Sequence, residues 1–306
     1  MTSTVPGAQP AAREPTFGTR IPYRRHIQIS LADLYAALRE VAPSATLGNW
    51  QGPFTAPPEN ELDPQMLSID GVPLVLMNGA VALPPAILDP GYLPNAMFPD
   101  AAYRLRDHQA HAVVLPARRA ADRPEWVATA RAITLLTWAI AKVTQAQAFK
   151  WEDANNFVPV SALEACGPQL LAADGMAIPI WVRILAGRAN GQQKLIAGSY
   201  GLWAFGLPEI EYAPTDLPLE YLVTRAYAIS EHLLTSNVSV KDGDTIGASD
   251  GGESFRAERL EHGFFGPAVA LRLSSLSASG QQTADLPAKG PDRGRWSWLG
   301  SLTGRR

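Results

Sequence analysis

The chain has 306 residues, of which 46% are hydrophobic and 18% charged, and its formal net charge is -3 at pH 7. This composition is typical of a soluble globular protein that buries a sizeable core without disulfides or metals. The single cysteine, Cys166, excludes an internal disulfide framework and a multi-cysteine zinc site. The weakly acidic balance gives no reason to expect nucleic-acid binding.

The N-terminal part carries no targeting signal that we recognise. Residues 1–20 lack an apolar core and helical periodicity, so we expect them to be disordered. The longest apolar stretches, such as Ala132–Val143, are too short to cross a bilayer. Together with the single cysteine, these features favour a bacterial-type cytoplasmic protein.

The body of the protein is predicted to span residues 21–275 as one α+β domain. It opens with a short strand at 27–29 and a helix after Ser30, whose hydroxyl can cap the first turn. Asp70-Gly71 lies between two apolar runs, which predicts a β-hairpin because both residues tolerate a positive φ.

The middle of the chain alternates strands with helices. Strands are predicted at 110–115 and 148–151, and a helix of about twenty residues begins at Pro124. A second helix is predicted at 160–171, with Cys166 as a small buried residue on its apolar face.

The final third mixes hairpins with one long helix. Strands at 178–185 and 195–205 should pair antiparallel, and a helix at 217–234 follows them. The expected fold is therefore α+β, a mostly antiparallel sheet packed against helices, with duplicated ferredoxin-like units as a further prediction. The last predicted strands lie at 245–247, 254–260 and 268–273. The aromatic residues expected in the core are Trp151, Trp181, Trp203 and Phe205.

Four segments carry a family resemblance. They are His108-Gln109-Ala110-His111, the neighbouring runs 149–151 and 156–158, the run from Tyr200 to Glu211, and the run from Asp242 to Gly247. In order and spacing they resemble the bacterial family named domain of unknown function 4261, over about residues 100–275. The family has no established activity, so the resemblance implies a domain boundary and no catalytic residue.

Acidic residues and one histidine are the candidates for catalysis. Glu209 and Glu211 share a face if their segment is a strand, and paired carboxylates can divide acid and base roles. His111 opens an apolar strand, while Asp242 and Asp244 flank the glycine of a turn. The structural alternatives are a solvated loop for the glutamates, a packed strand start for the histidine and turn chemistry for the aspartates.

No metal and no cofactor are expected. His108 and His111 precede a strand, where an odd offset sends side chains to opposite faces, and a third ligand is lacking. We expect His108 to be solvated. The glycine motifs of nucleotide-binding proteins and the HExxH motif of zinc proteases do not occur in the sequence.

The C-terminal residues 276–306 are predicted to be a disordered tail that ends in basic and aromatic residues. Between 289 and 306, five basic residues stand against one acidic residue, a net charge of +4. Exposed tryptophan side chains are unfavourable in water unless another surface covers them. We expect that surface to belong to a protein partner. The alternatives are the protein's own acidic body and an anionic membrane, and nucleic acid is disfavoured. The candidate binding residues are Arg293, Arg295, Trp296, Trp298, Arg305 and Arg306.

These features favour a non-enzymatic binding or adaptor protein whose target is another protein. The alternative is a small-molecule hydrolase-like enzyme that uses the acidic residues and His111. Convergence of those side chains in one pocket would distinguish the enzyme from the binding protein.

Overall fold

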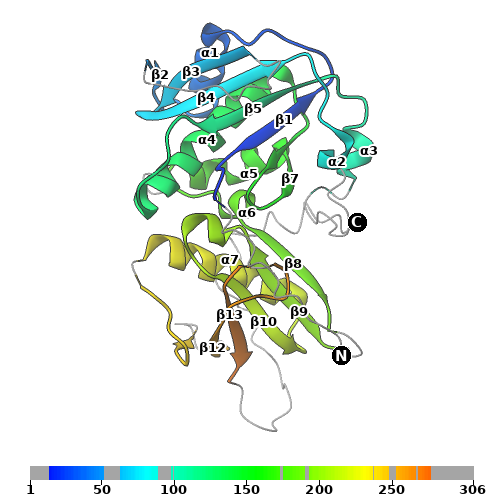
Figure 1. Ribbon diagram of the computed structural model, residues 1–306, viewed down its shortest axis with the longest axis vertical. Coiled ribbons are helices and arrows are strands. Elements are labelled where there is room, and N and C mark those ends of the chain that lie inside the picture. The colour runs from blue at the N-terminus through cyan, green and yellow to red at the C-terminus, as the bar shows by residue number, and fades with distance from the viewer. Residues whose placement is uncertain are drawn as a thin grey trace, which may run out of the picture.

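The computed structural model describes residues 14–51, 63–88, 98, 100–172, 175–189, 193–236, 238–247, 253–266 and 268–276. In these ranges the chain forms two β-sheets with their helices, placed one above the other along the long axis of the molecule (Figure 1). Both sheets are largely antiparallel and both carry helices, so the expected α+β class is confirmed.

The N-terminal lobe, residues 14–172, is built on a seven-stranded antiparallel sheet in the order β2-β3-β4-β5-β1-β6-β7. The long helix α4 runs across one face of this sheet and contacts α1 and α5 (Figure 1). The strands are β1 (Thr19–Tyr23), β2 (Leu47–Asn49), β3 (Asp63–Ile69), β4 (Val72–Gly79), β5 (Ala110–Pro116), β6 (Ala148–Trp151) and β7 (Asn156–Pro159). The helices are α1 (Leu31–Val41), α2 (Pro85–Leu88), α3 (Ala101–Arg104), α4 (Arg123–Thr144) and α5 (Val160–Leu170).

The C-terminal lobe, residues 175–276, contains a six-stranded sheet in the order β11-β12-β13-β10-β9-β8. Its strands pair antiparallel except for β10 with β13, and α7 packs on β8, β9 and β10. The two sheets differ in strand number and order, so duplicated ferredoxin-like units are not shown. The strands are β8 (Arg183–Arg188), β9 (Leu195–Tyr200), β10 (Glu209–Thr215), β11 (Thr245–Ile246), β12 (Phe255–Leu260) and β13 (Ala270–Ser275). The helical elements are α6 (Ile178–Trp181), the 3-10 turn η1 (Leu202–Phe205) and α7 (Leu219–Thr235).

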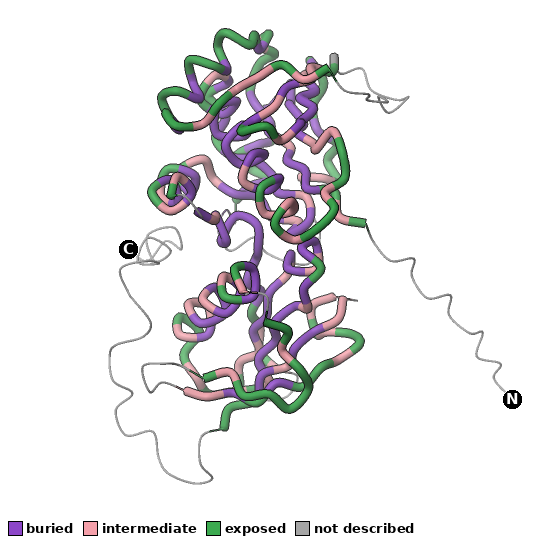
Figure 2. The backbone as a smooth tube through the Cα atoms, turned by 90° about the vertical axis from the view of Figure 1, so that its left-hand side faces the viewer, coloured by how far each residue is buried: buried purple, intermediate pink, exposed green. Residues whose placement is uncertain are grey.

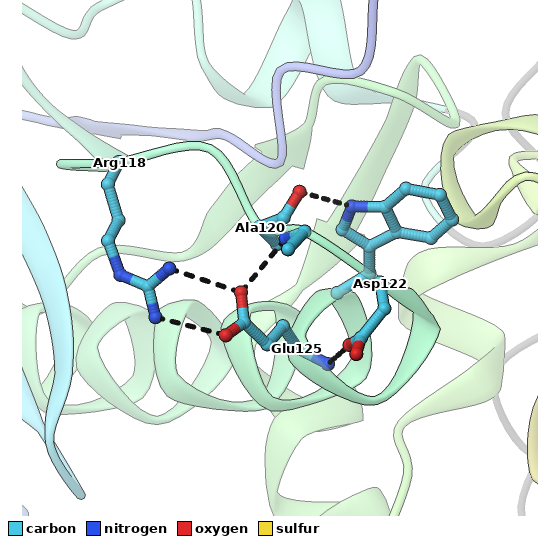
Figure 3. A network of polar contacts seen from close by, with 6 residues as sticks. Arg118, Ala120, Asp122 and Glu125 are labelled. Atoms are coloured by element: carbon cyan, nitrogen blue, oxygen red, sulfur yellow. Dashed lines mark hydrogen bonds and ion pairs between the residues drawn. The ribbon is translucent and has the colours of Figure 1, made fainter.

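Local chemistry explains where the first helices begin. Ser30 caps α1: its hydroxyl accepts from the Asp33 amide at 3.1 Å, and the Asp33 carboxylate accepts from the Ser30 amide. Asp122 caps α4 in the same way, accepting from the amide of Glu125 at 3.0 Å (Figure 3). The Asp70-Gly71 hairpin between β3 and β4 is confirmed, and both residues have positive φ.

Aromatic stacking joins the two lobes into one core. Trp181 lies between Trp151 and Phe205, with ring centroids 6.3 Å and 5.8 Å away, and Phe205 meets Phe17 edge to face at 5.2 Å. All four side chains are buried, and the Trp181 indole donates to Thr134 Oγ1 at 2.9 Å. The buried part of the backbone accordingly continues from one lobe into the other (Figure 2).

Tertiary contacts changed several predicted boundaries near the N-terminus. The segment 27–29 is not a strand, because side chains satisfy its carbonyls: Asn78 Nδ2 donates to Ile27 O and Gln65 Nε2 to Ile29 O. The prediction that residues 1–20 are disordered is wrong at the end of this range, because β1 begins at Thr19 and Phe17 is buried. Residues 1–13 lie outside the described ranges.

Two predicted strands of the C-terminal lobe are shorter than expected. Residues 178–181 form the helical turn α6, so β8 begins only at Arg183. The strand expected at 195–205 ends at Tyr200, because Gly201 has a φ of 130° and a side chain there would collide with the Trp181 carbonyl. Trp203 on η1 is therefore half-buried, whereas Trp151, Trp181 and Phe205 are buried as expected.

Two apolar features belong to the core. Helix α4 is long and apolar enough to cross a membrane, yet 72% of its most apolar 18-residue window is buried inside the protein. Cys166 is buried on α5, and burial raises the pKa of its thiol to about 12. The expectation that Cys166 is a small core residue is thus confirmed.

Removing the central ring of the aromatic stack should destabilise the whole protein. We expect Trp181→Ala to lower the free energy of unfolding by about 3–5 kcal/mol, because it leaves a cavity and removes the hydrogen bond from the indole to Thr134 Oγ1. Tyr103→Ala is the control, since Tyr103 is 67% exposed. Urea denaturation followed by tryptophan fluorescence measures both, and equal midpoints for the two variants would contradict the role of the stack.

Candidate functional site

Glu209, at the start of β10, is buried and holds the turn between β9 and η1. Its carboxylate accepts from Ser199 Oγ at 2.5 Å, from the Gly201 amide at 2.7 Å and from the Trp203 amide at 3.1 Å. Burial nevertheless raises its pKa, because desolvation outweighs these donors. All three partners belong to the fold, so the carboxylate acts as an anchor for this turn.

Glu211, two residues further along β10, anchors a different segment. Its Oε1 atom accepts from the amides of Phe264 and Phe265, and Arg272 Nη2 lies 3.7 Å from its Oε2 atom. Burial raises the pKa of Glu211 as well. The alternative of a solvated loop is wrong for both glutamates, because each is buried on a strand. Each carboxylate is held by its own set of donors.

His108 and His111 both lie in the N-terminal lobe and contact its backbone. His111, on β5, is buried, and its Nδ1 lies 2.6 Å from the Val81 carbonyl; burial lowers its pKa. The expectation that His108 is solvated is wrong: it is buried, receives the Leu83 amide at Nε2 and contacts the Leu105 carbonyl through Nδ1. His111 and the two glutamates of β10 therefore stand on different sheets (Figure 1).

Asp242 and Asp244 form a turn, as the structural alternative for them predicted. Asp242 Oδ1 accepts from the Arg259 amide at 2.9 Å, Asp244 Oδ2 accepts from the Lys241 amide at 2.7 Å, and Gly243 has a φ of 83°. Both aspartates are exposed. Within the described ranges, no group of three or more His, Cys, Asp or Glu side chains is placed to hold a metal.

One sequence match has the wrong structural setting. Residues 247–251 read Gly-Ala-Ser-Asp-Gly, the spacing of a serine-hydrolase nucleophile turn, which joins a strand to a helix. Here the segment follows β11 and precedes β12, and these two strands pair antiparallel. Residues 248–252 lie outside the described ranges, as do the tail residues Arg293, Arg295, Trp296, Trp298, Arg305 and Arg306.

A groove of about 400 Å³ lies where the N-terminus of α4 meets the C-terminal lobe. It is lined by four stretches of chain and by α4. The lining residues are Arg123 from α4; Trp203, Gly206, Leu207 and Pro208 around the turn before β10; Leu233, Val238, Ser239 and Val240 from the end of α7 and beyond; Arg259 from β12; and Val269 and Leu271 near β13.

The aromatic wall of the groove is positioned by the N-terminal lobe. Trp203 donates from its indole nitrogen to the Asp153 carbonyl at 3.2 Å. Behind Gly206, the Trp126 ring lies so close that a side chain at Gly206 would approach it to 2.8 Å. Trp126 donates to the Ala120 carbonyl, within the network that includes Glu125 at the start of α4 (Figure 3).

Two arginines and no carboxylate line the groove. Arg123 Nη1 donates to the carbonyls of Leu233 at 3.3 Å and Ser236 at 3.0 Å, so it caps the end of α7. The exposed Arg259 side chain makes no hydrogen bond or ion pair with the residues that the structure describes. Sequence reasoning missed this groove, because its residues come from segments that only the fold brings together.

The buried carboxylate of Glu209 predicts a pH-dependent stability. Because burial raises its pKa above the ordinary 4.5, the folded state holds the proton longer than the unfolded chain. The stability of the wild type relative to Glu209→Gln is therefore expected to fall as the pH rises above about 4.5. Urea denaturation at several pH values measures this difference, with Glu258→Gln on the exposed side of β12 as the control. Parallel profiles for the wild type and Glu209→Gln would refute it.

Comparisons with known proteins bear on the segment that builds the groove. The family described as Domain of unknown function (DUF4261) matches residues 198–274, a range that includes every lining residue of the groove except Arg123. Neither a curated protein nor a solved structure was found to match the chain. The match is shorter than the expected range of about 100–275. Residues 198–274 are thus the part of the chain that is similar to the family described as Domain of unknown function (DUF4261).

Proposed function

We propose that the protein is a non-enzymatic binding protein that holds a segment of a partner protein in the groove beside Trp203. The observation that carries this proposal is the composition of the groove walls: apolar side chains, one half-buried tryptophan and two arginines, with no carboxylate. Tryptophan and arginine are the residues most enriched at binding hot spots, and acidic residues are depleted there.

The exposure of apolar groups at the groove supports a partner as its occupant. Val238 is 56% exposed although it borders a surface of largely buried residues such as Leu233 and Leu271. Covering apolar surface of this kind is favourable in water, at about 25 cal/mol for each Å² removed. The positive charges of Arg259 and Arg123 favour an acidic group beside the apolar side chains of the partner.

The hydrolase-like alternative has less support. General acid–base catalysis needs side chains within hydrogen-bond reach of one substrate atom. Glu209 and Glu211 each bind backbone amides of their own lobe, and His111 is held by Val81 in the other lobe. Because each of these three side chains has its own partners, their arrangement does not favour contact with one shared substrate atom.

We extend the proposal to the tail, residues 289–306, as a second contact with the partner. Its net charge of +4 and the indoles of Trp296 and Trp298 provide both electrostatic and apolar contributions. The groove rim is also basic, so charge argues against the tail as the occupant of the groove.

The single cysteine suggests that the protein is cytoplasmic, and this localisation stays a prediction.

Selection from a random peptide library displayed on phage tests the groove. We expect enriched peptides to combine an acidic residue with apolar neighbours, and to bind Arg259→Glu about 10-fold more weakly than the wild type because the charge is reversed. Arg256→Glu is the matched control, since Arg256 is exposed on the same strand but does not line the groove. Enrichment of no peptide, or equal losses in both variants, would disprove the groove as the binding site.

Truncation tests the tail separately. Deletion of 289–306 should leave the melting temperature unchanged, because we propose that the tail binds a partner and does not pack on the body. The same deletion, and the double change Trp296→Ala with Trp298→Ala, should abolish capture of the proteins that the full-length chain retains from a cell lysate. Binding to anionic but not neutral vesicles would assign the tail to a membrane instead. Identical captured proteins and no vesicle binding would refute the tail's role.

A further inference from the structure

In the part of the chain that the structure describes, each β-sheet ends in two edge strands, and three of these four strands are poorly suited to further pairing. β2 has three residues, β11 has two, and β7 has four, of which the last is Pro159. Short strands and prolines are common means by which proteins keep a sheet edge from pairing with another chain. β8 is the exception, because it has six residues, contains neither proline nor lysine, and carries the uncharged run 184–187 at its centre.

The backbone of β8 directs every second residue toward the free side of the sheet. The Ala189 amide donates to the Lys194 carbonyl at 3.0 Å, so these two residues are a hydrogen-bonded pair of the β8–β9 hairpin. Such pairs alternate along an antiparallel ladder, so the odd-numbered residues of β8 direct their amides and carbonyls at β9. The amides and carbonyls of Ile184, Ala186 and Arg188 point away from β9, and they bind no residue that the structure describes.

The second half of this edge is open to solvent. Ala186 and Arg188 are exposed, while Ile184 is the most shielded of the three outward residues, at 8% exposed. Helix α7 packs on β8 and leaves this edge free. A row of unpaired amides and carbonyls is complementary to another extended chain, which adds to the sheet as a further strand.

We propose that β8 pairs antiparallel with β8 of a second copy of the chain, with Ala186 on the two-fold axis. In this register Ala186 lies opposite its own copy, Ile184 lies opposite Arg188 of the partner subunit, and Leu185 lies opposite Gly187 of the partner subunit. Outward-directed residues therefore face outward-directed residues, so their amides and carbonyls bind one another. Each larger side chain meets a small or flexible one, and no two arginines face each other, which would be unfavourable.

The contact is closed, because the same edge serves both copies and none remains for a third. It joins two six-stranded sheets into one continuous sheet. A single short strand buries less area than a standard protein interface, so we expect a dissociation constant on the order of micromolar. The groove beside Trp203 includes no residue of β8, so this inference is independent of the proposed function.

Sedimentation equilibrium of the full chain tests the pairing. We expect mainly dimers at about 100 µM and mainly monomers at about 1 µM. Ala186→Lys places two like charges face to face at the axis and should raise the dissociation constant at least about 10-fold. Ala36→Lys adds the same charge at an exposed position of α1 and is the matched control. A wild type that stays monomeric up to about 100 µM, or equal dissociation constants for the two lysine variants, overturns the proposal.

Disulfide cross-linking tests the register, and it decides the question if Ala186→Lys does not fold. The native cysteine, Cys166, is buried, so an introduced surface thiol reacts first. Hydrogen-bonded pairs have Cα atoms about 5.5 Å apart, within reach of a disulfide, so air oxidation should link Ala186→Cys into a covalent dimer. Arg188→Cys should stay unlinked, because its Cα would lie more than about 13 Å from its own copy. Equal cross-linking of both variants, or none of Ala186→Cys, overturns the pairing.

Discussion

The aromatic stack at the lobe junction is the interaction on which the rest of the structure depends. Trp181 fills the space between Trp151 of one sheet and Phe205 of the other lobe, and Phe17 closes the stack. With the rings in place, η1 and the start of α4 are held together, and the groove lies along this junction. Core packing therefore positions the Trp203 wall of the groove, whose indole donates to the Asp153 carbonyl, and a preformed wall reduces the entropy lost on binding.

The buried carboxylates of Glu209 and Glu211 hold two turns of the C-terminal lobe in place. Glu209 and Glu211 point to catalysis when only sequence is considered, because paired carboxylates can divide acid and base roles. In the folded chain each accepts hydrogen bonds from backbone amides of a turn. A carboxylate is well suited to this work, since it accepts several hydrogen bonds at once. Burial raises the pKa of both carboxyl groups, because anchoring a turn from inside the protein removes them from water.

The arginines divide into those that complete the fold and those that it leaves available. Arg123 caps the end of α7 and thereby ties the two lobes together. Arg259 projects beside the groove, and Arg225 on α7 is buried without an ion pair among the described residues. A cation that the fold does not neutralise favours anions. The proposed binding at the groove rests on Arg259, which remains available there.

The sequence by itself determined the elements whose signals are local. Ser30 caps its own helix, Asp70-Gly71 forms its own turn, and the periodicity of α4 and α7 comes from neighbouring turns. Only the tertiary structure decided that 27–29 is not a strand, since its partners Gln65 and Asn78 are distant in sequence. The same holds for the groove, for the buried glutamates and for Arg225. Whether a polar side chain is an anchor or a free ligand depends on which distant backbone groups reach it, and a local pattern carries no information about those groups.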